Sequence, residues 1–177
     1  MTLLFCIATA INLLALTATA VLGYGVSNGR AWSAQHQLCG VLATIVCVGV
    51  HCVVFTYFIA TAKWVQHAVS VKGLDPSLIS PTRSFRAAAF PAALLAMAIV
   101  FVTAMLGAAR DNGLIARGPH HVLAVAAMAT NIVVAAIEYR AIARNGRLID
   151  RVLAEVASKD SSPSAAEAPV DRRAMIG

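Results

Sequence analysis

Apolar residues gather along the chain in four long runs that are separated by shorter polar segments. The runs cover residues 3–24, 38–62, 87–109 and 121–142. Each run is long enough to cross a hydrocarbon core of about 30 Å, which takes roughly 20 helical residues. Lipid cannot satisfy free backbone N–H and C=O groups, and the alternating pattern of a membrane barrel strand is missing from these runs. The predicted fold class is therefore all-α, an integral membrane four-helix bundle.

Composition excludes several other classes of protein. Hydrophobic residues make up 59% of the 177 positions and charged residues 12%, whereas a soluble domain is near half apolar and a quarter charged. The mean hydropathy of +0.77 agrees with this. Collagen, a disordered chain and a disulfide-stapled secreted module do not have this composition either. The lipid bilayer is thus the first expected partner of the chain.

Basic residues lie almost entirely on one side of the four predicted spans. Eleven are in the segment between the second and third spans, at the inner end of the fourth span or after it, against three in the other two connections. The positive-inside rule then places both termini in the cytoplasm, and we expect a bacterial inner membrane. This asymmetry also explains the net charge of +6 without nucleic acid as a partner, because basic residues meet anionic headgroups there.

The segments outside the spans carry weaker signals. Ala18 and Ala20 flank Thr19 as in a signal-peptide cleavage site, but no positive charge precedes this long apolar run, so we expect it to be retained. Residues 63–86 predict an irregular cytoplasmic loop. Apolar residues recur at helical spacing over 149–156, which predicts a short helix in the inner interface. We therefore expect a membrane domain over residues 1–157 and a disordered cytoplasmic tail over 158–177.

The chain matches itself without gaps at an offset of 84 residues. Over eighteen positions from Thr19 to His36, seven residues recur in the segment from Thr103 to His120, in the pattern T-A-x-L-G-x4-N-G-x6-H. Two copies of one helical hairpin, related by an axis along the membrane normal, would produce this pattern. The alternative is that Asn-Gly is a favoured turn pair and that histidine is common near the interface.

The two histidines of this pattern are the main candidates for chemistry. At 100° per residue, His36 and His120 each lie on a helix face of small residues, and both are expected at one depth near the outer surface. In an up-down-up-down bundle the second and fourth helices are diagonal, and cofactors are held between facing helices. His36 and His120 are thus candidate axial ligands of a b-type haem, with His121 as a competing ligand.

Three glycines and three arginines complete this candidate site. Gly23, Gly107 and Gly40 would leave room for the porphyrin, and Arg30, Arg110 or Arg117 could pair with the haem propionates.

Two other interpretations of the histidines remain open. A histidine at the end of a transmembrane helix is often simply hydrated, and the Cys-x-x-Cys-His motif of c-type haem is missing from the sequence. Copper is the other metal to consider, with Cys39, Cys47 and Cys52 near His51 as soft ligands. These cysteines are spread around one helix, however, which favours a role as small apolar residues.

His51 and Glu138 are the deeper polar candidates, and ionisable groups inside a membrane are costly enough to suggest a function. If they touch, Glu138 could orient His51, or the pair could relay protons to a quinone site on the inner side. Alternatively, Glu138 reaches the interface and pairs with Arg140, Arg144 or Lys63.

The sequence contains no nucleophile–base–acid constellation or phosphate loop, so the chain is at most a non-catalytic redox subunit of a membrane oxidoreductase. Its architecture and histidine placement resemble four-helix membrane cytochromes, although it matches no diagnostic motif of theirs. We expect a cytochrome b-like electron-transfer or anchor subunit of a respiratory-type complex, with other membrane subunits and a quinone as partners. The alternative is a cofactor-free accessory subunit of a larger membrane complex. A transporter is less favoured because paired charges and broken helices are missing.

Overall fold

The computed structural model describes residues 1–29 and 31–161 and is built almost entirely of helices. In chain order these are α1 (Thr2–Ser27), α2 (Ser33–Lys72), the short 3-10 helix η1 (Pro76–Ile79), α3 (Ser80–Asp111) and α4 (Arg117–Ser161). Each of the four α-helices is long and apolar enough to cross a membrane. The predicted all-α class is confirmed, and each of the four predicted apolar runs lies within one helix.

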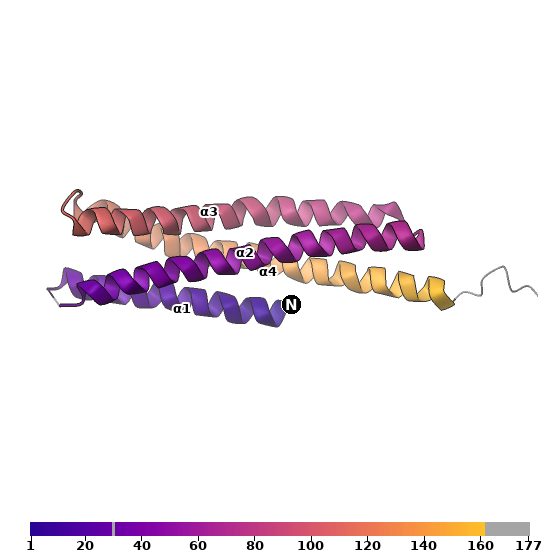
Figure 1. Ribbon diagram of the computed structural model, residues 1–177, viewed down its shortest axis with the longest axis horizontal. Coiled ribbons are helices and arrows are strands. Elements are labelled where there is room, and N and C mark those ends of the chain that lie inside the picture. The colour runs from indigo at the N-terminus through magenta and orange to yellow at the C-terminus, as the bar shows by residue number, and fades with distance from the viewer. Residues whose placement is uncertain (30, 162–177) are drawn as a thin grey trace, which may run out of the picture.

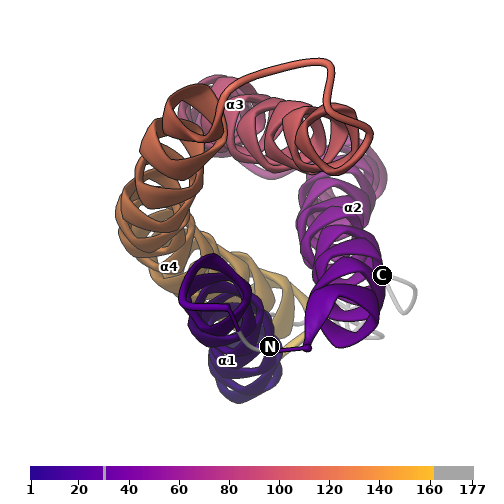
Figure 2. The ribbon, with the colours of Figure 1, turned by 90° about the vertical axis from the view of Figure 1, so that its left-hand side faces the viewer.

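The four helices run up and down in one bundle (Figure 1). Seen end-on, they follow one another around the bundle, so that α2 and α4 lie on opposite sides (Figure 2). We call the end with the α1–α2 and α3–α4 connections the turn end, and the end with η1 and the last residues of α4 the far end. α1 is the shortest of the four and covers only the half of the bundle nearer the turn end (Figure 1).

The two connections at the turn end use the same local chemistry. α1 and α3 end at asparagine caps, Asn28 and Asn112, and each asparagine is followed by a glycine with positive φ. The φ angles are 81° at Gly29 and 74° at Gly113, in a region that side chains other than glycine rarely adopt. The Asn-Gly pairs of the sequence therefore reverse the chain in the same way twice.

The far end differs from the prediction. The segment expected to be an irregular loop is mostly helical, because α2 continues to Lys72 and only residues 73–75 separate it from η1. Residues 149–156, expected to form a separate interfacial helix, are the last part of α4, and Val152 is fully buried. The sequence argument failed because the apolar stripe of α4 has protein partners. One cluster joins it to α2 and η1: Val65, Val69, Leu74, Leu78, Leu148 and Val152. Of the predicted disordered tail, residues 158–161 are helical and 162–177 lie outside the described residues.

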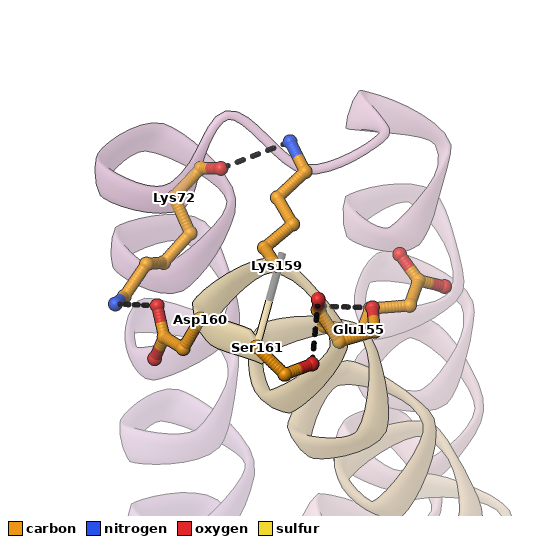
Figure 3. A network of polar contacts seen from close by, with 6 residues as sticks. Lys72, Glu155, Lys159, Asp160 and Ser161 are labelled. Atoms are coloured by element: carbon orange, nitrogen blue, oxygen red, sulfur yellow. Dashed lines mark hydrogen bonds and ion pairs between the residues drawn. The ribbon is translucent and has the colours of Figure 1, made fainter. Parts of the chain in front are cut away.

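Polar contacts hold the end of α4 against the end of α2 (Figure 3). Lys159 Nζ donates to the backbone carbonyls of Lys72 and Gly73, which the helix end leaves without a helical partner. Lys72 Nζ in turn lies 2.6 Å from Asp160 Oδ1. Because α2 has 40 residues and α4 has 45, at 1.5 Å per residue they span about 60 and 67 Å, well beyond a hydrocarbon core. The far end is therefore a packed extension of the bundle beyond the membrane thickness.

Candidate functional site

A cavity of about 760 Å³ lies inside the bundle at the turn end, lined by residues of all four helices. Its floor is made of small or branched apolar residues, including Ala43, Val100 and Ala127, all of which are buried. Pockets for cofactors and other small molecules have volumes of about 300–1,000 Å³ and are mostly apolar with a few placed polar groups. By size and lining, the cavity belongs to this class.

Polar side chains surround the mouth of the cavity. Gln37 Nε2 donates to Asp111 Oδ2 over 2.8 Å, which ties α2 to the end of α3. Arg110 Nη1 lies 3.8 Å from Asp111 Oδ1 and also lines the cavity. Of the other candidate arginines, Arg117 begins α4 outside the cavity lining, and Arg30 lies outside the described residues.

His36 and His120 both line this cavity, and their ring centroids are 6.1 Å apart with the ring planes at 77°. Each Nδ1 bonds a backbone carbonyl of the preceding helix, His36 to Thr19 O at 3.0 Å and His120 to Thr103 O at 3.1 Å. Because a carbonyl only accepts, each Nδ1 must carry the proton and donate it. In the neutral rings both Nε2 atoms then keep a lone pair, which is the state a metal-ligating imidazole needs.

Gly23 and Gly107 make room for these two imidazole rings. A Cβ placed on Gly23 would lie 2.8 Å from His36 Cε1, and one on Gly107 would lie 3.0 Å from His120 Cε1. Real Cβ atoms essentially never come as close as the distance at Gly23, and the distance at Gly107 is tighter than nearly all real Cβ contacts, so a side chain at either position would push against the ring. Gly40 differs, since a Cβ there would make an ordinary contact of 3.7 Å with Thr19 Cγ2.

The other candidate ligands, His121 and the three cysteines of α2, are not arranged around one point with His36 and His120. The His121 ring stacks on Tyr24, with centroids 5.8 Å apart and planes at 13°, although it also borders the cavity. Cys47 is buried, Cys52 is exposed and Cys39 is partly buried, so the thiols do not converge. Over residues 1–29 and 31–161, no group of three or more His, Cys, Asp or Glu side chains is arranged to hold a metal ion.

Below the cavity floor, a layer of polar side chains crosses the core. Asn12 Nδ2 donates to Asn131 Oδ1 over 3.0 Å, and the Cys47 thiol donates to the same oxygen over 3.5 Å. Asn131 Nδ2 donates to the carbonyl of Ala127, one turn closer to the cavity. All these side chains are buried, with Asn12 only 3% exposed. Helices α1, α2 and α4 are thus linked at one depth.

One turn further from the cavity, His51 Nδ1 lies 2.8 Å from Glu138 Oε1, and the two side chains are 3% and 1% exposed. The geometry therefore brings this pair together inside the core, and Glu138 does not extend toward Lys63, Arg140 or Arg144. His51 Nε2 has no hydrogen-bond partner among the described residues. The remaining histidine, His67, is exposed on the surface of α2.

Sequence reasoning placed the histidines, glycines and Asn131 on the core faces of their helices, but it missed the other partners of these groups. Asn12 could not be assigned to the core face of the first helix, because apolar residues occupy all faces of that helix. The carbonyls of Thr19 and Thr103 belong to the backbone and leave no signal of their own. The recurring seventeen-residue distance from each threonine to its histidine is the pattern that could have indicated these bonds.

Comparisons with protein-family models, curated proteins and solved structures gave no match.

Proposed function

We propose that this chain is a membrane cytochrome b-like electron-transfer or anchor subunit of a respiratory-type complex, with haem b held between α2 and α4 by His36 and His120. The observation that carries the proposal is the pair of imidazoles, 6.1 Å apart across the turn-end cavity, each with its Nδ1 proton bonded to a backbone carbonyl. Such a bond fixes the tautomer and the ring direction of a metal-ligating histidine.

The residues around the cavity fit such a group in three respects. His36 and His120 face one cavity from opposite sides of the bundle with ring centroids 6.1 Å apart, so a single group held between α2 and α4 could contact both rings. The cavity volume of about 760 Å³ suits a cofactor with the dimensions of a porphyrin. Small side chains on both ligand helices, Gly40 and Ala43 on α2 and Ala124 and Ala127 on α4, border it.

The chain's own residues would bind, orient and shield the haem, which supplies one-electron transfer when bound. His36 and His120 would hold the haem iron through their Nε2 atoms, while Gly23 and Gly107 let the rings sit against α1 and α3. Arg110 at the mouth offers positive charge for a propionate. The apolar lining of the cavity would lower the local dielectric around the haem, which is one lever on a haem potential.

His51 and Glu138 serve in this proposal as a proton relay. A quinone pool is the electron donor or acceptor that best suits such a subunit, because quinone chemistry in a membrane couples electrons to protons. Other membrane subunits would carry the catalytic chemistry, since the segments that join the four helices are too short to form a catalytic domain. The apolar outer faces of the four helices suit lipid and such partners equally.

We also propose an orientation, with both termini in the cytoplasm of a bacterium and the turn end at the outer face of its inner membrane. The eleven-to-three distribution of basic residues supports it. A phosphatase reporter, active only outside the cytoplasm, should be inactive when fused after Ser161 and active when inserted after Gly113. The reverse pattern would contradict the orientation.

Finally, we propose that the two hairpins are copies of one ancestral unit. The Asn-Gly turns, the positive φ of Gly29 and Gly113, and the two histidine–threonine bonds recur at the same offset of 84 residues. Parallel repeats of this kind are related by an axis along the membrane normal.

The test of the haem is an absorption spectrum of detergent-purified protein, expressed with ample haem. Wild type should show the bands of reduced low-spin haem b, and His36→Ala or His120→Ala should remove them. His67→Ala is the matched control, because His67 is exposed on the same helix as His36 and should leave the bands intact. Wild-type protein that purifies colourless would end the cytochrome proposal and leave the cofactor-free accessory subunit.

A further inference from the structure

Three polar atoms in the core lack a hydrogen-bond partner within the described part of the chain: Thr9 Oγ1, Asn12 Oδ1 and His51 Nε2. Asn12 belongs to the polar layer through its bond to Asn131, while Thr9 is about one turn from Asn12 on α1 and His51 one turn from Cys47 on α2. An unpaired polar group in a dry core costs about 1–3 kcal/mol. Three such atoms in one region therefore indicate a missing ligand rather than three separate defects.

The chemistry of the three atoms identifies that ligand as water. Asn12 Oδ1 only accepts, and His51 Nε2 accepts when Nδ1 donates its proton to Glu138. The Thr9 hydroxyl can both donate and accept. A water molecule has two donors and two acceptor sites, and buried waters typically make about three hydrogen bonds to such groups. A metal ion is a poorer match, because the neighbouring carboxylate and thiol already have partners.

The surroundings of the layer are different on its two sides. Toward the far end, one turn beyond His51 and Glu138, lies a dense apolar plug in which every member is at most 4% exposed: Phe5, Val54, Phe58, Ala89, Ala141 and Ile142. Toward the turn end a smaller apolar cluster, Cys47, Val100 and Ala127, is also buried. Val100 and Ala127 themselves line the cavity, so only one layer of small or branched side chains separates the cavity from the polar groups. Asn131 spans this side, because its amide bonds both Asn12 and the carbonyl of Ala127.

We propose that the layer holds internal water at Thr9, Asn12 and His51, and that the proton between His51 and Glu138 exchanges with solvent through the turn-end cavity, not through the far end. In this exchange a proton passes from the pair to a water molecule and another returns. Only N–H and O–H bonds form and break, so the step needs no oxidant or reductant. The proposal concerns the polar core of the chain and goes beyond the haem, since it does not require a cofactor to be bound.

Among the described residues, the ionisable groups nearest the pair are Cys47 and the partly buried Tyr57, both on α2. α3 has no titratable side chain between Arg86 and Arg110, and α4 has none between His121 and Glu138. α1 contributes only Cys6 and Tyr24, both of which are exposed. On α2 the Cys47 thiol faces the pair, and Cys52 is exposed. The infrared signals that exchange can therefore be attributed to the His51–Glu138 pair by comparing wild type with a variant in which only Glu138 is replaced.

The test follows infrared bands of the pair while protein in lipid vesicles is moved from H₂O to D₂O, with no haem added. The bands are assigned by subtracting the spectrum of Glu138→Gln, which keeps the length and a hydrogen bond to His51. Wild type should exchange readily. Asn131→Leu and Thr9→Val should slow the exchange at least tenfold, because each removes a polar group of the proposed hydrated route between the pair and the cavity.

Asn145→Leu is the matched control, because Asn145 is also a buried asparagine of α4 but lies beyond the plug, bonded to Thr61. It should leave the rate unchanged. Thr9→Val preserves the shape of the side chain. If Asn131→Leu does not fold, the exchange rate of Thr9→Val alone tests the proposal. Bands that never shift in D₂O, equal rates in wild type and Thr9→Val, or slowing by Asn145→Leu would each overturn the proposal. None of these outcomes depends on whether the protein binds haem.

Discussion

In both helical hairpins, α1–α2 and α3–α4, a histidine near the start of the second helix bonds a carbonyl of the first helix. The distances agree within 0.1 Å, at 3.0 Å for His36 to Thr19 and 3.1 Å for His120 to Thr103. Deeper in the core the same comparison gives different residues. Cys47 of the first hairpin corresponds to Asn131 of the second, 84 residues later, and Thr61 corresponds to Asn145.

The histidines are alike and the deeper residues differ because the two sets of side chains have different roles. At the turn end both hairpins contribute the same group, an imidazole, to one cavity. In the core, the corresponding residues of α2 and α4 bond each other, thiol to amide at Cys47–Asn131 and amide to hydroxyl at Asn145–Thr61. Asn131 also accepts from Asn12 of α1, so the second hairpin places an amide, with both donors and an acceptor, where the first hairpin has only a thiol.

The largest effect that tests this comparison should come from the two glycines beneath the histidines. Gly23→Ala and Gly107→Ala would each place a Cβ within 3.0 Å of an imidazole carbon. Each ring would have to shift, which would strain its bond to the threonine carbonyl. Overpacking of this kind costs about 1–3 kcal/mol, so haem affinity should fall roughly tenfold or more in each variant. Titration of haem into apoprotein measures this.

Gly49→Ala is the control for these two variants, because a Cβ at Gly49 meets no described atom within 4 Å. It should bind haem like wild type. If the hairpins are equivalent, the two glycine variants should lose affinity to a similar degree. A large loss in one variant with wild-type binding in the other would mean that a single histidine holds the cofactor and that the second hairpin differs in function.

Much of the fold could be predicted from the sequence because membrane spans depend on local composition. Twenty apolar residues in a row have few alternatives to a helix in lipid, and the Asn-Gly pairs mark the turns. The far end could not be predicted in the same way. Its helices depend on contacts between Val65 or Val69 and Val152, almost ninety positions later in the chain, and an apolar stripe looks the same whether lipid or protein covers it.

The candidate site also combines features that the sequence predicts with features that it does not. Depth and helix face follow from residue spacing, so the sequence sufficed to place His36 opposite His120 and to put His51 near Glu138. Whether the last pair touches depends on helix tilt and on side-chain rotamers, which spacing does not fix. The alternative pairing of Glu138 with Arg140, Arg144 or Lys63 is not the one that the structure contains, since Glu138 is buried and its carboxylate lies 2.8 Å from His51 Nδ1.

The smallest effect should come from the polar layer, where the hairpins differ most. Asn131→Leu would leave the Asn12 amide without its partner, whereas Cys47→Ala would remove only a long thiol bond. Interhelical hydrogen bonds in membrane proteins contribute on the order of 1 kcal/mol. We expect Asn131→Leu to lower the free energy of unfolding in detergent by about that amount, and Cys47→Ala by less.

A double-mutant cycle separates this bond from the change in packing. If Asn12 and Asn131 stabilise the core through each other, the variant carrying both Asn12→Leu and Asn131→Leu should be less destabilised than the sum of the single variants. The coupling should be near the 0.6–1.7 kcal/mol scale measured for such bonds elsewhere. Strict additivity would mean that each amide is satisfied separately, for instance by water. The asymmetry between the hairpins would then arise from hydration of each asparagine and not from a direct contact between α1 and α4.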